Sequence, residues 1–105
     1  MHRRALAEAA DDSTVLTNLM TGRPARGIVT RFIREQGPIA ETPPFPLATV
    51  AVGPLRAAAE KAGSGDFSPL WSGQAPSLGR RNVPAAELTR QLAADALARL
   101  KALSA

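Results

Sequence analysis

Apolar residues repeat at helical spacing in two stretches of the first half of the chain. Three of them share one face near the start and predict a short helix over residues 2–10. A longer stripe follows Pro24, a residue suited to a first helical turn, and stops before a glycine–proline pair. The members of this stripe are Ala25, Ile28, Val29, Phe32 and Ile33. The spacing predicts a second helix over residues 24–36.

Two further helical stripes occupy the second half of the chain. The first covers residues 47–62, and Gly53 and Pro54 in its middle predict a break or kink, because proline lacks an N–H and its ring meets the preceding turn. The second begins at Pro84 and consists of Leu88, Leu92, Ala96, Leu100 and Leu103. This last pattern predicts a helix that runs nearly to the end of the chain.

A single short run has the character of a strand. Residues 14–20 are rich in β-branched and apolar side chains and are bounded by turn formers. Because a lone strand cannot satisfy its own backbone groups, its partners are expected outside this chain or in a second copy. The predicted fold class is mainly α with one short strand.

Two segments predict loops. Residues 41–46 are too rich in proline for regular structure and should run extended over a surface. Residues 64–81 mix glycine, serine and proline with large apolar side chains, which predicts a loop held in place by those side chains. The large residues are Phe67, Leu70, Trp71 and Leu78.

Length and composition exclude several classes of protein. The 105 residues are far fewer than the roughly 250 that a (β/α)8 barrel needs, so residues 1–105 are expected to form one segment. Without cysteine there is no disulfide, thiolate metal site or cysteine nucleophile. No apolar run approaches a membrane span and the basic start lacks a hydrophobic stretch behind it, so a cytoplasmic location is expected.

Ordered motifs across the chain resemble one enzyme family, the nitronate monooxygenases (2-nitropropane dioxygenases), in its C-terminal portion. Residues 21–28 (TGRPARGI) with 31–35 (RFIRE), residues 45–59, and residues 70–74 (LWSGQ) resemble successive family motifs, as do 84–88 (PAAEL) and 2–6 (HRRAL). Each motif is short, and their common order and spacing carry the resemblance. Met1 is expected to fall inside a longer enzyme.

The resemblance implies an FMN-dependent flavoprotein, a TIM-barrel (β/α)8 oxidoreductase with a small helical domain, of which this chain is a fragment. The family oxidises alkyl nitronates with O2 to carbonyl compounds and nitrite, and the flavin carries the electron chemistry. A barrel histidine is the family's base, and His2, the sole histidine here, lies in a segment that the family does not use for catalysis. No catalytic, flavin-binding or metal-binding residue is therefore expected in this chain, which should bind no FMN and be inactive alone.

The resemblance also points to one segment near the family's substrate cavity, and its candidates are Trp71, Gly73 and Gln74. Trp71 would offer a flat apolar wall and Gln74 an amide for a polar ligand. The alternative is structural, with Trp71 anchoring a loop and Gln74 stabilising it. The family's glycine after the glutamine is Ala75 here, so a left-handed turn at this position would be strained.

Two other classes of function compete with this reading. The net charge of +4 and four arginines over residues 23–34 raise the question of nucleic acid. Nine acidic residues are interspersed and no helix-turn-helix pattern accompanies them, so nucleic-acid binding is not expected and the arginines should be solvated or paired. The second class is a small helical interaction module that dimerises through the stripe from Leu88 to Leu103 and the strand edge. The expected partners are the remainder of the barrel enzyme, or a second copy bound through Leu88, Leu92 and Leu100, with no membrane.

Overall fold

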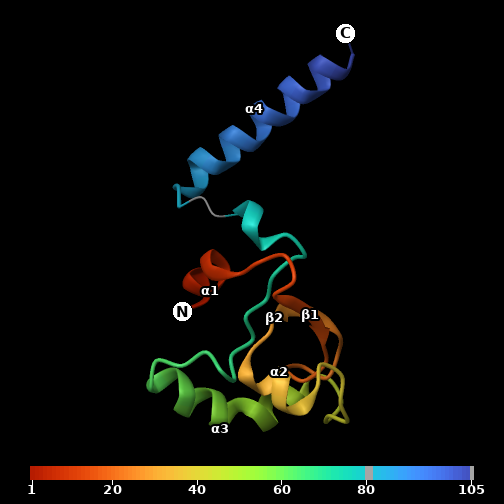
Figure 1. The fold of residues 1–105 in the computed structure, drawn as a ribbon, viewed down its shortest axis with the longest axis vertical. Helices are drawn as coiled ribbons and strands as arrows, with labels where there is room; N and C mark the ends of the chain where they lie inside the picture. The colour runs from red at the N-terminus through yellow and green to blue at the C-terminus, as the bar shows by residue number, and fades with distance from the viewer. Residues whose placement is uncertain (80–81, 105) are drawn as a thin grey trace.

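The computed structural model describes residues 1–79 and 82–104. In chain order the elements are α1 (His2–Glu8), β1 (Thr14–Thr17), β2 (Ala25–Ile28), α2 (Arg31–Gln36), α3 (Leu47–Lys61), the 3-10 turn η1 (Pro76–Gly79) and α4 (Ala85–Leu103). The strands, α2 and α3 gather in one body, and α4 projects away from it at the opposite end from α3 (Figure 1).

The predicted lone strand has a partner within the chain. β1 pairs antiparallel with β2, in a register that sets Val15 against Gly27 and Thr17 against Ala25. The prediction of one strand with partners elsewhere is therefore wrong, and so is the prediction of a single helix over residues 24–36. That stretch is a strand followed by the short helix α2.

The connection of this hairpin explains why its second strand was read as helix. Gly22 adopts φ +90° and donates its N–H to the carbonyl of Asn18 at 2.8 Å, which turns the chain back on itself. Pro24 thus precedes a strand instead of a helical turn. A helical period fitted the apolar positions because strand β2 and helix α2 each bury some of them, and local spacing cannot separate the two cases.

A small core lies between the hairpin and α2. Leu19, Met20 and Ile33 are buried together, and the partly buried side chains that pack on them are Val15, Val29, Phe32, Ala40 and Trp71. The buried hydroxyl of Thr17 accepts a hydrogen bond from the N–H of Leu19 at 3.2 Å. The core therefore joins residues from the hairpin, α2 and the later loop.

Helix α3 presents an apolar face outward. Ala48 and Val52 are buried against the body, whereas Leu47, Val50 and Leu55 are at least half exposed. A break or a kink was predicted at Gly53 and Pro54, and the helix continues without a break through Pro54. The carbonyl that this proline leaves without an N–H partner is that of Val50, on the exposed side, where water can satisfy it.

The predicted helices at the two ends of the chain are confirmed, with α1 ending earlier than expected. No residue of α4 is buried. Its projection makes the molecule 54 × 27 × 23 Å with a radius of gyration of 17.2 Å, against about 13 Å for a compact domain of this length. No helix within the described residues has both the length and the apolar character to cross a membrane.

The long loop is held by only some of the predicted side chains. Leu70 is buried, and the ring of Phe67 lies 5.6 Å from that of Phe32. Leu78 is 83% exposed, so the prediction that its side chain helps to hold the loop in place is wrong. The loop also contains η1, which lies against α1. The proline-rich segment over residues 41–44 is without regular structure, as predicted.

Candidate functional site

The segment that contains the site candidates runs along the free edge of β2. The N–H of Ile28 donates to the carbonyl of Leu70 at 2.8 Å, and the N–H of Ser72 donates to the carbonyl of Arg26 at 3.2 Å. Gly27 and Trp71 face each other as an antiparallel bridge. Residues 70–72 thus form a short third row of the sheet.

Gly27 permits this close approach. A Cβ atom at this position would lie 3.2 Å from the carbonyl oxygen of Leu70 and 3.3 Å from the ring of Trp71. The Trp71 side chain is half-buried and packs on the core cluster. Its position in the fold is therefore fixed both by its backbone and by its ring.

The other two candidates lie beyond this anchored row. Gly73 and Gln74 are exposed, and a Cβ at Gly73 would meet nothing within 4 Å. No non-glycine residue in the described part of the chain has a positive φ, so Ala75 does not introduce the left-handed strain that was considered. The three candidates adjoin one another in sequence, and only Trp71 has a defined packing environment in this chain.

A histidine contact ties this segment to the start of the chain. His2 Nε2 lies 2.7 Å from the carbonyl oxygen of Trp71, so this ring nitrogen carries the proton and donates it. Arg3 Nη1 donates to Asn82 Oδ1 at 3.1 Å. No catalytic role was expected for His2 from the sequence. It is exposed but bonded, and nothing in the local sequence signals a partner 69 residues away.

The described structure also contains a hollow beside α1. A cleft of about 800 Å³ opens between α1, the ends of the hairpin, the start of α2 and residues 63–70. Its polar lining includes Arg4, Ser13, Thr30, Arg31, Arg34 and Asp66. Trp71, Gly73 and Gln74 do not line it. Local sequence patterns do not reveal this cleft, because its lining comes from three separate stretches, residues 1–13, 28–34 and 63–70.

Two of the three arginines that line this cleft are paired within their own helices. Arg4 bonds to Glu8 at 3.0 Å, and Arg31 bonds to Glu35 at 2.6 Å, which raises the pKa of Arg31. Arg34 forms no ion pair within the described residues and reaches only the Val29 carbonyl, at 3.5 Å. Of the four arginines over residues 23–34 that were expected to be solvated or paired, Arg31 forms an ion pair within the described residues.

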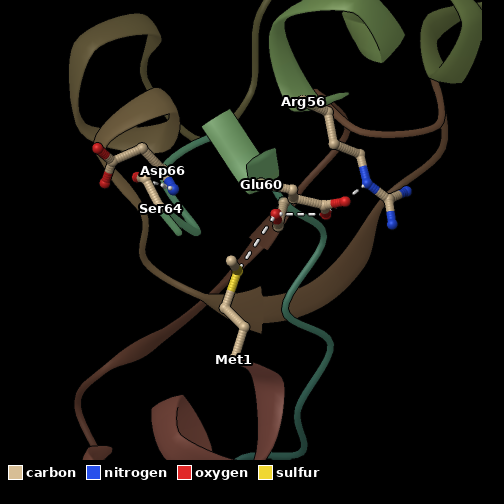
Figure 2. Close-up of polar contacts among 6 residues, drawn as sticks. Met1, Arg56, Glu60, Ser64 and Asp66 are labelled. Carbon is tan, nitrogen blue, oxygen red and sulfur yellow. Dashed lines mark hydrogen bonds and ion pairs between the residues drawn. The ribbon is translucent and has the colours of Figure 1, made fainter. Parts of the chain in front are cut away.

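A polar cluster joins the inner side of α3 to the loop that follows it (Figure 2). Glu60 accepts hydrogen bonds from the Ser68 hydroxyl at 2.7 Å and from Arg56 at 2.8 Å. The hydrogen bond from Ser68, and to a lesser extent the one from Arg56, holds the pKa of Glu60 below its ordinary value. The Ser68 hydroxyl also approaches the sulfur of Met1 at 3.7 Å. Among the described residues, no group of His, Asp and Glu is arranged to hold a metal ion.

Comparisons with known proteins agree on one family. Residues 1–95 match the family model of nitronate monooxygenase. The chain is 39% identical over 93 residues to a nitronate monooxygenase of Pseudomonas aeruginosa, covering 87% of this chain and 26% of that protein. It is 35% identical over 79 residues to a probable nitronate monooxygenase of Staphylococcus saprophyticus, covering 74% of this chain and 22% of that protein.

A solved structure extends this agreement to three dimensions. Nitroalkane oxidase from Streptomyces ansochromogenes superposes with a TM-score of 0.81 at 40% identity, over 97% of this chain and 29% of that one. The chain thus spans between a fifth and a third of the length of these relatives. The sequence match and the shared fold together show that this chain belongs to the nitronate monooxygenase family.

Proposed function

We propose that this chain is the C-terminal part of an FMN-dependent nitronate monooxygenase, an enzyme that oxidises alkyl nitronates with O2 to carbonyl compounds and nitrite. The observation that supports the proposal is the family match over residues 1–95. The relatives are three to five times longer than the segment they share with this chain. The missing length is enough for the (β/α)8 barrel of about 250 residues on which such an enzyme would be built.

We also propose that the chain alone neither binds FMN nor turns over substrate. A flavin phosphate needs free backbone N–H groups that converge, typically at a helix start. Here α3 begins after prolines, and the N–H groups of Leu47 and Thr49 are bonded to the carbonyls of Pro44 and Pro46. At α4 the N–H groups of Glu87 and Leu88 are bonded to the carbonyl of Pro84. The starts of α3 and α4 therefore do not fit the phosphate.

The partner of this segment would be the remaining barrel part of the enzyme, and the outer face of α3 is where we place the contact. Leu47, Val50 and Leu55 are 54%, 72% and 53% exposed, and Lys61 is the one charged residue among them on this face. Exposing an apolar helix face of this kind to water costs free energy, and burial against another surface removes this cost. Trp71 and Gln74 would then border the substrate cavity between the two parts.

A chimera tests the family function. This chain would replace the matching segment of the Pseudomonas aeruginosa nitronate monooxygenase, and flavin content and nitronate-dependent O2 uptake would be measured. We expect both to be retained. A chimera that folds and holds flavin yet consumes no O2 with any alkyl nitronate would contradict the proposed reaction.

The isolated chain tests the second proposal. It would be purified with excess FMN and examined for bound flavin absorbance and for O2 uptake above that of free FMN. We expect neither. Stoichiometric flavin retention with turnover would overturn the proposal that this part is inactive alone. The cytoplasmic location stays a prediction, which fractionation of the source cells would check.

A further inference from the structure

Helix α4 carries a leucine stripe that the rest of the described chain leaves open. Leu92, Leu100 and Leu103 are 61%, 64% and 86% exposed, and Leu88 is only half-buried. At 3.6 residues per turn these four side chains fall within about one third of the helix circumference. We propose that this leucine stripe binds the same stripe of a second copy of the chain, with the two helices antiparallel.

The spacing of the leucines fits a second copy because it is nearly the same in both directions. Leu88 and Leu103 are centred between residues 95 and 96, and Leu92 and Leu100 are centred on residue 96. Antiparallel pairing about this point sets Leu88 opposite Leu103 and Leu92 opposite Leu100. Ala96 lies at the centre, where its small side chain lets the helices approach. A surface that complements itself under reversal is what a two-fold dimer requires.

The shape of the molecule favours the antiparallel direction. The body is attached at the N-terminal end of α4, and the rest of the helix projects freely (Figure 1). Parallel helices would bring the two bodies side by side and crowd them, whereas antiparallel helices of 19 residues separate them by roughly 28 Å.

Charged residues along one edge of the stripe complement each other in the same register. Asp95 and Arg99 lie one turn apart beside the leucines. In the antiparallel pair, Arg99 of one copy lies level with residue 92 of the other, within one turn of the other copy's Asp95. The contact is short, since 19 residues make fewer than three heptads, so the dimer is weak and depends on concentration.

Sedimentation of the full chain without flavin tests the interface. The apparent mass should rise with concentration from 11.0 kDa toward twice that value. Leu92→Glu and Leu100→Glu should each weaken association about tenfold or more, because they bury a carboxylate against leucine. Leu97→Glu is the matched control, since Leu97 is 68% exposed on the same helix but off the stripe. Circular dichroism would show that every variant keeps its helix.

Cysteine cross-linking tests the direction, since the native chain has no cysteine. Ala96→Cys should cross-link to itself across the centre, and Leu88→Cys should cross-link to Leu103→Cys but not to itself. A monomer at every concentration, equal disruption by Leu97→Glu, or self-cross-linking of Leu88→Cys would overturn the proposal. The test needs neither flavin nor nitronate, so its failure would leave the proposed function standing.

Discussion

The side chain of Asn18 pairs with the backbone of Ala40 as a neighbouring strand would. Its Nδ2 donates to the Ala40 carbonyl at 2.8 Å, and its Oδ1 accepts from the Ala40 N–H at 3.1 Å. The two residues are 22 positions apart, so this pair closes the loop between the hairpin and the proline-rich segment. One partly buried amide thereby satisfies two backbone groups.

Asn18→Ala should therefore destabilise the chain. It leaves a partly buried N–H and carbonyl without partners, which costs about 1–3 kcal/mol. Urea unfolding followed by circular dichroism would measure the change. Asn82→Ala is the control, because Asn82 forms an exposed hydrogen bond and its loss should change stability by less than about 0.5 kcal/mol. Equal effects of the two substitutions would contradict the role given to Asn18.

Gly27→Ala should loosen the row formed by residues 70–72. The new Cβ would press on the Leu70 carbonyl and the Trp71 ring, and overpacking of this kind costs about 1–3 kcal/mol. Trp71 is the only tryptophan, so its fluorescence reports directly on this contact. Gly73→Ala should leave both fluorescence and stability nearly unchanged, since its Cβ meets nothing. An unchanged spectrum for Gly27→Ala would count against the close packing.

Gly22 and Gly37 allow backbone strain to be separated from steric contact. Both have positive φ, +90° and +81°, so alanine at either should cost roughly 1–2 kcal/mol. At Gly22 the Cβ would also lie 2.7 Å from the backbone of Phe45 and Pro43, whereas at Gly37 it meets open space. Urea midpoints should fall further for Gly22→Ala than for Gly37→Ala. The reverse order would be inconsistent with the packing of the hairpin turn.

Acid should remove the contribution of Glu60 to stability. Because its pKa is lower in the folded chain than its ordinary 4.5, the stabilisation is present above that value and is lost as pH falls through the folded pKa. Glu60→Gln should lower stability at neutral pH and flatten the acid limb of a plot of unfolding free energy against pH. Ser68→Ala should have the same two effects on stability and on the acid limb, but smaller ones. Glu41→Gln, at an exposed site, should leave the acid limb as it is.

The sequence predicted the elements whose patterns are local. Helices α1, α3 and α4 follow from apolar spacing, and β1 follows from its β-branched residues. Strand β2 was missed because it is held by partners distant in sequence, β1 on one edge and residues 70–72 on the other. Local preferences around Gly27 are weak, and tertiary hydrogen bonds decide the outcome.

The candidate site was predictable only as a segment. The motif around Trp71 identified the row beside β2, but the amino-acid order did not reveal that Gly27 accommodates it or that His2 bonds to its backbone. The cleft lined by Thr30, Arg34 and Asp66 draws on segments that no spacing rule connects.

The bond from His2 to the carbonyl of Trp71 also sets an order of events during synthesis. Within this segment, α1 leaves the ribosome before its side-chain partners, which lie at Trp71 and Asn82, at least 69 residues later. Until these residues emerge, α1 is a seven-residue helix without a surface to dock on, too short to persist in water. Helix α1 is therefore made before the elements between it and Trp71 but is secured after them.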